Sequence, residues 1–574
     1  MLKPTTERCL CWSLLAATFA VRAIHPDQPI VENYVGRQVP TAMVARNLER
    51  GSGFLRPQLD TGPFPNLFLV EPPIYAQVVA WVHRGIGFDW EICGRLTSAL
   101  ATTLGAWGLF GLARRREGPT VALLALGSFC LFPVMVRYGR AFQPDALMLG
   151  FVLAGLRGWD EFEASGRPAW TIFGGFVLAI GLALKITSAW ALIPFWLIAR
   201  RLPIAARSGW ALAMLAPALA WYGHAWGLMQ ANPGDSRASG DNAGLWLASF
   251  GPAGWLRSAT LDPIARNLLW RAFTPVGFVL ASWGLIATGP LDRAWKGWGA
   301  GCGLALLALA PKWHHGYYWL AFAPLAAVGV GRGLTGLASR GRTGRSPLDS
   351  SGRGNGDWLR RGTSGARPHL PAHDARSATA LGVASAVVIG FVFAGLAGIQ
   401  SASTFRTPAE WRVLDVPKER AKLENLGVLS AFVAPEALLY YLDTRGFRLE
   451  HEPAAIRRAA GEWGGRIADP ERPTALVDYY HGQGAIDPIR FASKPRPSPV
   501  GGCAVAWNSP ILRVADVGFV REDRRRLAWR EAIRNRPGTR IEVDRDDLFI
   551  ATLISRAPIT PPPPSPGPTE GETP

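Results

Sequence analysis

The chain has 574 residues, of which 49% are hydrophobic and only 18% are charged, and it contains 24 tryptophans. A soluble chain usually carries about 25% charged residues, so this composition argues against an ordinary cytosolic enzyme. The formal net charge of +18 is compatible with nucleic-acid binding, but such binding needs a basic face on a soluble domain. The six cysteines show neither a disulfide framework nor the spacing of a zinc site. The placement of the charges along the chain must therefore decide between these classes.

Apolar runs long enough to cross a bilayer recur along the chain. A hydrocarbon core of about 30 Å takes about 20 mostly apolar residues per helix. The first run starts near Cys9, and we interpret it as a membrane anchor because no small-residue cleavage site follows it. Lys185 separates two further runs, which are either two spans or one kinked helix. We predict about eleven transmembrane helices, namely the first run and 93–113, 119–136, 144–158, 169–184, 186–199, 209–228, 273–289, 297–311, 316–331 and 378–398.

Clusters of basic residues indicate the orientation of these spans. Cytoplasmic loops of membrane proteins are enriched in Lys and Arg, and Arg114-Arg115-Arg116 and Arg200-Arg201 lie in short connections on one side. The connection 332–377 on the same side holds nine arginines and three aspartates in a Gly/Ser-rich sequence, and we expect it to be cytoplasmic and disordered. The basic excess thus indicates topology, and no nucleic-acid partner is expected. With eleven spans and the N-terminus inside, the C-terminus lies outside.

The polar segments define the domain organisation. Residues 1–400 form the multi-span part, whose long outer loop 25–92 contains the helical stretch TAMVARNLERG. Residues 401–557 alternate strand-like runs (GVLSAFV, TALVDYY, DLFIATL) with helical ones (PEALLYYLDTRG, AWREAIRNR), which favours a small α/β domain. Residues 558–574 are a Pro-rich tail that we expect to be disordered. The predicted fold class is an α-helical multi-pass protein of the cell membrane with a C-terminal α/β domain outside it.

Ionisable residues gather at the predicted outer ends of the spans. Burying an unpaired charge is costly, so charges at the membrane boundary are informative. They are Asp27, Glu32, Arg37 and Glu71 in the first outer loop, Arg137, Arg140 and Asp145 before the fourth span, and Lys185, Lys312, His314 and His315 further along. Their convergence on one side predicts an outward cavity for an anionic ligand that carries phosphate.

Several stretches occur in an order that resembles a known family. They are GRQVPTAMVARNLERGSGFLRPQLD, VEPPIYAQVVAWVHRGIG, GRLTSAL, RYGRAFQPDALML, GLALKITSAWALIPFWL and KWHHGYYWLAFAPLAAVGVG. Over roughly residues 10–335 the chain resembles the polytopic GT-C glycosyltransferases of the protein O-mannosyltransferase and aminoarabinose-transferase type. The resemblance implies a GT-C-like fold and transfer of a sugar from a polyprenyl-phosphate carrier at the outer membrane face. The implied partners are this sugar donor and a lipid, glycan or protein acceptor.

This chemistry gives roles to the outer charges. Inverting transfer needs a carboxylate that takes the proton of the acceptor as the acceptor attacks the anomeric carbon. The leaving group is already a phosphate, so cations that neutralise its charge replace a general acid. We predict Glu32 or Asp27 as the catalytic base and Asp145 as a second acid that orients acceptor or sugar. The predicted substrate-binding residues are Arg37, Glu71, Arg140, Lys185, His314, His315 and Tyr318.

One departure from the family pattern concerns the first acid. Family members carry it just before the helical stretch, where this chain has Arg37-Gln38 or Pro40 and its nearest carboxylate is Glu32. Either the loop brings Glu32 into that place, or the first acid is missing and the chain is not a standard transferase. Glu71 fits the E-x-P pattern of the family, but a carboxylate there also suits the capping of a helix that begins near Pro73.

Two other classes of protein stay open. A transporter or flippase for lipid-linked or anionic solutes also lines its path with charges, although internal repeats and charges at mid-membrane are typical of that class. A non-catalytic envelope scaffold fits the Pro-rich tail. No cofactor is assigned, and a divalent metal remains an open alternative because the histidines and acids show no recognisable ligand spacing.

Overall fold

The computed structural model describes most of the chain up to residue 406 and short segments beyond it. The chain divides into two compact units, the first made of residues 1–28, 70–227 and 238–406 and the second of residues 29–69, 228–237 and 407–574. The described residues are 3–32, 35–62, 66–232, 236–237, 251, 255, 258–309, 315–343, 372–406, 427–431, 437, 440–441, 445–448, 501–508, 511–518, 531, 534–535, 539–544 and 548–553. The predicted strand at 474–480 and the predicted tail at 558–574 lie outside these residues.

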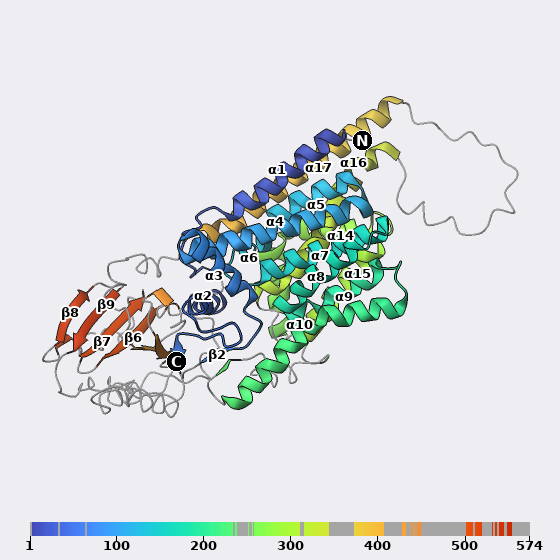
Figure 1. Ribbon diagram of the computed structural model, residues 1–574. Coiled ribbons are helices and arrows are strands. Elements are labelled where there is room, and N and C mark those ends of the chain that lie inside the picture. The colour runs from blue at the N-terminus through green and yellow to red at the C-terminus, as the bar shows by residue number, and fades with distance from the viewer. Residues whose placement is uncertain are drawn as a thin grey trace, which may run out of the picture. The chain divides into compact units, whose positions relative to one another are not determined.

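The first unit is built from helices (Figure 1). Each predicted span coincides with helix over most of its described length. The α-helices are α1 (Pro4–Arg22), α3 (Ile74–Ile86), α4 (Trp90–Glu117), α5 (Pro119–Leu131), α6 (Pro133–Tyr138), α7 (Asp145–Ser165), α8 (Ala169–Leu184), α9 (Leu192–Ile198), α10 (Ile204–Ala231), α13 (Ser258–Arg266), α14 (Pro275–Ile286), α15 (Arg293–Ala308), α16 (Ala323–Thr343) and α17 (Ala372–Ser401). Short 3-10 or π-helical turns are η1 (Ile186–Ala191), η3 (Asn267–Ala272), η5 (Gly316–Phe322) and η7 (Ala402–Phe405).

Small residues allow the central helices α4, α7 and α8 to pack closely. A Cβ added to Gly150 of α7 would lie 2.4 Å from the carbonyl oxygen of Ala101 in α4. A Cβ on Gly158 of α7 would lie 2.8 Å from the Cα of Gly174 in α8. Such close backbone approach is typical of helix pairs in membrane proteins, where van der Waals packing replaces the hydrophobic effect.

The number of membrane spans differs from the predicted eleven. Among the described residues, three helices are long and apolar enough to cross a bilayer, namely Trp90–Glu117, Gly316–Ser339 and Ala380–Phe405. A fourth span is counted if the helices Ile264–Ala272 and Pro275–Ile286, bent by 104° at their junction, act as one. The count of eleven is therefore not confirmed. Several predicted spans are helices of 13 to 16 residues, which reach only about 20 to 24 Å at 1.5 Å per residue.

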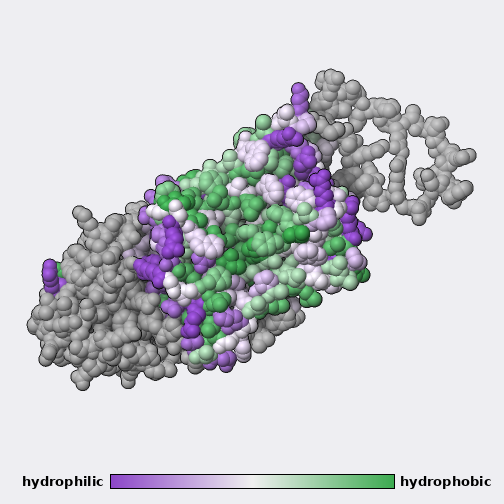
Figure 2. Space-filling view, in the orientation of Figure 1, coloured by the Kyte–Doolittle hydropathy of each residue, from purple (hydrophilic) through white to green (hydrophobic). Residues whose placement is uncertain are grey.

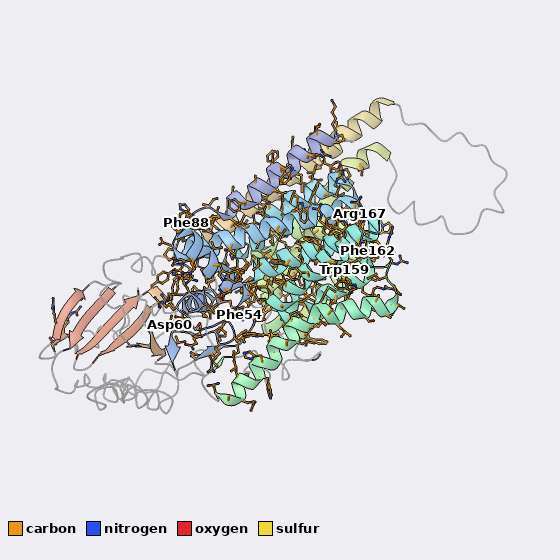
Figure 3. All side chains as sticks on the ribbon, viewed as in Figure 1. Phe54, Asp60, Phe88, Trp159, Phe162 and Arg167 are labelled. Atoms are coloured by element: carbon orange, nitrogen blue, oxygen red, sulfur yellow. The ribbon has the colours of Figure 1, made fainter. Side chains whose placement is uncertain are left out.

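The surface of the helical unit is nevertheless polarised in the manner of a membrane protein. Hydrophobic residues form a broad zone over its helices, and hydrophilic residues gather toward its two ends (Figure 2). Phe88, just before α4, and Arg167, just after α7, lie near opposite ends of this unit (Figure 3). The first of these ends is the predicted outer end and the second is the predicted inner end.

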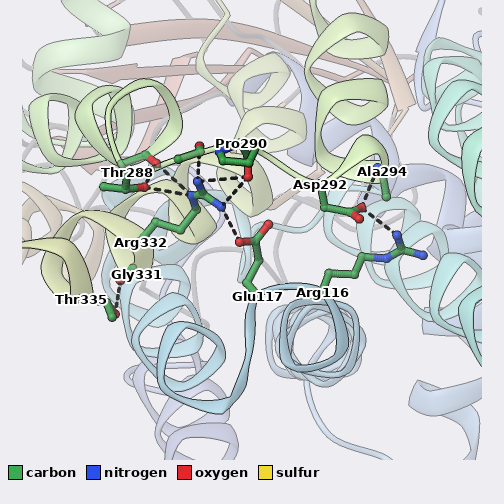
Figure 4. Close-up of polar contacts among 11 residues, drawn as sticks. Arg116, Glu117, Thr288, Pro290, Asp292, Ala294, Gly331, Arg332 and Thr335 are labelled. Carbon is green, nitrogen blue, oxygen red and sulfur yellow. Dashed lines mark hydrogen bonds and ion pairs between the residues drawn. The ribbon is translucent and has the colours of Figure 1, made fainter. Parts of the chain in front are cut away.

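Ion pairs connect the helices at the predicted inner end (Figure 4). Arg116 of α4 pairs with Asp160 of α7 at 2.5 Å and with Asp292, the residue before α15, at 2.7 Å. Arg332 of α16 pairs with Glu117 at 2.5 Å and donates hydrogen bonds to the carbonyl oxygens of residues 284 and 289. The prediction that a disordered loop begins at residue 332 is wrong, because α16 continues to Thr343 and Arg332 is buried with partners for its charge. Residues 344–371 of that predicted loop lie outside the described part.

The second unit contains one helix of the first predicted outer loop and a sheet. The predicted helical stretch TAMVARNLERG is confirmed over residues 41–49, which belong to α2 (Val35–Glu49). The sheet has the strand order β1-β5-β4-β6-β7-β9-β8, with β1, β5 and β4 parallel and the other pairs antiparallel. Its strands are β1 (Thr61–Gly62), β4 (Gly427–Ala431), β5 (Arg445–Arg448), β6 (Gly501–Asn508), β7 (Ile511–Gly518), β8 (Thr539–Asp544) and β9 (Leu548–Leu553), and a separate pair joins β2 (Leu67–Phe68) to β3 (Ser236–Arg237).

Two details of this sheet bear on the predictions for the C-terminal region. Strands β4 and β9 fall within the predicted strand runs GVLSAFV and DLFIATL, which confirms those two runs. The sequence predicts that residues 445–446 end a helix, but they belong to β5, where both pair with β4 and Gly446 also pairs with Thr61 of β1. The helical half of the predicted α/β domain falls mostly outside the described residues, so the α/β assignment itself stays a prediction.

Candidate functional site

A buried ion pair between α7 and the end of α8 forms the centre of the candidate site. Asp145 is the first residue of α7 and is 2% exposed, and Lys185 follows α8 and is 6% exposed. The Lys185 Nζ lies 2.7 Å from the Asp145 Oδ1. Lys185 has an extended backbone (φ −154°, ψ 113°), so the chain breaks there between α8 and η1. The two predicted runs on either side of Lys185 are therefore separate helices.

Aromatic rings from η5 surround the Lys185 ammonium group. Its Nζ lies 4.6 Å from the ring centroid of Tyr317 and 5.5 Å from that of Tyr318, distances at which ring faces stabilise a cation. The His315 ring stacks on Tyr317 with centroids 5.4 Å apart and an interplanar angle of 10°. Gly316 is required between them, because a Cβ there would lie 2.5 Å from the Tyr138 hydroxyl oxygen. The structure thus brings four predicted site residues, Asp145, Lys185, His315 and Tyr318, into one cluster.

A pocket opens beside this cluster. Its polar lining comes from Asp145, Thr187, Tyr317 and Tyr318, and its apolar lining includes Trp190. The Asp145 Oδ2 has no hydrogen-bond partner among the described residues, although this carboxylate is almost completely buried. A buried acceptor without a partner is costly, so the pocket offers an unused acceptor to a ligand that donates a hydrogen bond. Aromatic rings and one carboxylate together suit a ligand that has both apolar and hydroxyl-bearing faces.

Arg140 holds the loop before α7 against the N-terminal segment. Its Nη2 donates to the carbonyl oxygen of His25 at 2.6 Å, and its guanidinium group lies 5.0 Å from the ring centroid of Phe405. Ser98 and Thr102 of α4 donate to the carbonyl oxygens of residues 141 and 139 at 2.7 and 2.8 Å. This predicted binding residue is therefore fully buried and contributes to the position of the loop that carries Asp145.

The start of α3 packs on the same part of α4. The Tyr75 hydroxyl donates to the carbonyl oxygen of Gly94 at 2.8 Å and lies 2.9 Å from the Ser98 Oγ. Burial raises the pKa of Tyr75 well above its usual range, so the hydroxyl remains a donor. Glu71 is buried three residues before α3 begins, and Asp27 is exposed.

Two more predicted site residues, Glu32 and Arg37, belong to the second unit. Glu32 is buried, and its carbonyl oxygen accepts a hydrogen bond of 2.8 Å from the Gln38 Nε2. Arg37 lies in the first turn of α2 with its guanidinium group 5.5 Å from the ring centroid of Phe68. Because α2 begins at Val35, the positions that replace the family's first acid lie inside the helix, and Glu32 precedes the helix by three residues.

Some residues of the site were not recognised in the sequence. Tyr317 and Trp190 contribute rings to the cluster and pocket, and Gln143 is a fully buried amide two residues before Asp145. The sequence shows only that Gln143 precedes Pro144 and Asp145, and a single glutamine carries little information in a sequence. His314 lies outside the described residues. No group of three His, Cys, Asp or Glu side chains that suits a metal ion occurs within the described part of the chain.

The fold of the chain is similar to that of glycosyltransferases of the GT-C class. The model of the dolichyl-phosphate-mannose-protein mannosyltransferase family matches residues 70–222, which include Asp145 and Lys185. The structure is similar to the crystal structure of ArnT from Cupriavidus metallidurans bound to undecaprenyl phosphate, with 14% sequence identity and a TM-score of 0.52 over 98% of this chain and 100% of that chain.

The same ArnT in the apo state is similar with 13% identity and a TM-score of 0.51, over 95% of this chain and 97% of that chain. No curated protein sequence matches the chain. The predicted resemblance to GT-C glycosyltransferases of the ArnT and protein O-mannosyltransferase type is thereby confirmed.

Proposed function

We propose that the protein is an integral-membrane glycosyltransferase of the cell membrane. It transfers a sugar from a polyprenyl-phosphate carrier to a lipid, glycan or protein acceptor at the outer face. The observation that carries this proposal is the buried Asp145–Lys185 pair, whose second carboxylate oxygen faces no protein partner in the described part of the chain. The likeness to ArnT over nearly the whole chain and the family match across this pair support the assignment.

The proposed transfer is a single displacement at the anomeric carbon of the donor sugar. An acceptor hydroxyl oxygen forms the new bond to this carbon as the bond between the carbon and the phosphate oxygen breaks. The acceptor proton passes to a carboxylate, for which Glu32 and Asp27 are the two candidates. The electron pair of the broken bond stays on the phosphate oxygen, which leaves as polyprenyl phosphate and needs no general acid.

Lys185 suits the role of stabilising the leaving phosphate. Its ammonium group is held before the reaction by Asp145 and by the faces of Tyr317 and Tyr318, so little reorganisation is needed as charge develops. In a water-poor site a fixed cation acts more strongly on developing negative charge than it would in water. Arg37, Arg140 and His315 are proposed to assist in holding the carrier phosphate, and Glu71, His314 and Tyr318 in binding the substrates.

The experiment is transfer from radiolabelled polyprenyl-phosphate sugars in membranes that contain the protein. Asp145→Asn and Lys185→Met should abolish covalent transfer while the protein remains inserted and folded. Asp292→Asn, which alters an ion pair at the predicted inner end, is the matched control and should keep transfer. Full activity of both site variants would refute the proposed roles. Uptake of a solute into proteoliposomes without a covalent product would instead identify a transporter.

The proposed orientation has its own test by cysteine labelling from one side of the membrane. A cysteine at Ser350 should react only from the cytoplasmic side and one at Gln483 only from outside. Reaction of both cysteines from the same side would contradict the proposed placement of the C-terminal domain.

A further inference from the structure

We infer that Gln28 and Gln143 form, together with the Asp145 Oδ2, a subsite that binds the hydroxyl groups of the donor sugar. This inference rests on the proposed function and assigns residues that select the sugar rather than the phosphate or the lipid. Gln28 and Gln143 are not among the charged and aromatic residues for which the sequence analysis predicts roles.

Both glutamine side chains are buried and lack hydrogen-bond partners among the residues that the structure describes. Gln28 is 6% exposed and Gln143 is 0% exposed. In each side chain the Oε1 and the Nε2 lack a hydrogen-bond partner among the described residues. Nearly all buried polar atoms of folded proteins are hydrogen-bonded, because an unsatisfied buried amide is costly. These four atoms and the Asp145 Oδ2 thus offer both donors and acceptors to a ligand.

Side chains on adjacent turns of α4 hold the backbones of the two segments. Arg95 of α4 donates to the carbonyl oxygen of Gln28 and, at 3.4 Å, to that of Pro26. Ser98, one turn further along α4, donates to the carbonyl oxygen of Ala141 at 2.7 Å.

Arg140 links the same two segments directly. Its bond to the carbonyl oxygen of His25 joins the loop that carries Gln143 to the segment that carries Gln28. Gln143 and Asp145 are further joined through one rigid connection, since Pro144 lies between them and α7 begins at Asp145. The three side chains thus belong to one local structure that buried arginines and α4 hold in place.

The chemistry of the three groups favours sugar hydroxyls over the other parts of the donor. A hydroxyl donates one hydrogen bond and accepts others, which matches an amide and a carboxylate. A phosphate would place its negative charge against the amide and carboxylate oxygens, and the isoprenoid chain would leave every one of these atoms unsatisfied. The phosphate instead has the Lys185 ammonium group, which lies on the other carboxylate oxygen of Asp145.

The test compares the affinity of the protein for a carrier with and without its sugar. The probes are undecaprenyl phosphate and its mannosyl, glucosyl, galactosyl and arabinosyl phosphodiesters, titrated against the full chain in nanodiscs. Of the four sugar-bearing carriers, the one whose sugar the wild-type protein transfers is used to compare the variants. Gln143→Leu and Gln28→Leu should each weaken binding of that probe at least tenfold and change the Kd for bare undecaprenyl phosphate less than twofold.

Stability separates this role from a purely structural one. Replacing an unsatisfied buried amide by an apolar side chain of similar size should leave the Tm without ligand unchanged or raised. Gln38→Leu is the matched control, because the Gln38 amide is buried and hydrogen-bonded, and its loss should lower the Tm. A fall in Tm for Gln143→Leu equal to that of the control would overturn the inference and indicate that ordered water satisfies the amide.

Two further outcomes bear on the inference and on the proposed function separately. The ratio of the affinity for the sugar-bearing carrier to that for bare undecaprenyl phosphate is the first readout. If this ratio is unchanged in both glutamine variants while the wild type transfers sugar normally, the inference alone is overturned. A higher KM for the acceptor with unaltered donor binding would also overturn it, since the subsite would then serve the acceptor. If the wild type transfers none of the sugars, the proposed function fails and the inference fails with it.

Discussion

Replacement of Asp145 by Asn should separate the structural from the chemical contribution of the Asp145–Lys185 pair. The two charged atoms are 2.7 Å apart, and the side chains are 2% and 7% exposed. At about 3 Å and an effective dielectric constant of about 20, the attraction is about 6 kcal/mol before desolvation is subtracted. Asp145→Asn leaves the Lys185 ammonium group buried without its counter-charge, a change that typically costs about 3–5 kcal/mol of unfolding free energy. We expect the lower end of this range, because Tyr317 and Tyr318 continue to stabilise the cation.

The double variant Asp145→Asn/Lys185→Met distinguishes the two contributions. It removes both charges, so its unfolding free energy should return to within about 1–2 kcal/mol of the wild type. Its transfer activity should remain lost, because neither the acid nor the cation is present. The measurements are denaturant titration in micelles and transfer of label per folded molecule.

Asp160→Asn provides the control for loss of a buried carboxylate as such. Asp160 pairs with Arg115 and Arg116 at the predicted inner end, at 2.9 and 2.5 Å, and its side chain is 3% exposed. This variant should lose stability and keep its activity per folded molecule. The reasoning would be refuted by a double variant as unstable as Asp145→Asn, or by full activity of Asp145→Asn.

Three more predictions concern the catalytic base, the inner-end ion pairs and the packing of α4. Of Glu32→Gln and Asp27→Asn, only the variant that removes the base should lower the transfer rate, by about 10²–10⁴-fold with little effect on donor affinity. Transfer at the wild-type rate by both variants would exclude both carboxylates as the base. Arg332→Met leaves the buried Glu117 carboxylate without this ion pair and should lower the unfolding free energy by about 3 kcal/mol in denaturant titration. An unchanged value would mean that water solvates the carboxylate in place of the arginine. Gly94→Ala should destabilise the protein by about 1–3 kcal/mol in the same titration, because the added Cβ would lie 2.1 Å from the Phe142 ring; no loss would show that the ring moves aside freely.

Hydropathy predicted the helices better than it predicted their relation to the membrane. An apolar run predicts a helix whether that helix spans a membrane or is buried in protein, so the predicted runs coincide with helices in the structure. Length decides whether a helix crosses a bilayer, and Pro119–Leu131 and Ile186–Ile198 are too short by this measure. The basic segment at residue 332 misled for a related reason. Its first arginine resembles the later ones in sequence, and only the ion pair with Glu117, far away in the chain, shows that Arg332 is buried with a partner.

The candidate site was predictable where it carries charge and unpredictable where it is neutral. Asp145 and Lys185 stood out because ionised side chains are rare near membrane spans, yet their pairing depends on the break after α8 and is visible only in the structure. Gln143 has no charge to mark it, and its proposed role rests on burial without a hydrogen-bond partner in the described part of the chain, which is a property of the surroundings and not of the residue. The charged residues therefore indicate where a phosphate would bind, whereas neutral amides such as Gln143 are the groups through which such a site would distinguish one sugar from another. If the charged residues bind the phosphate and the amides bind the sugar, substitutions at Gln28 and Gln143 should change the sugar preference while Asp145 and Lys185 remain unchanged.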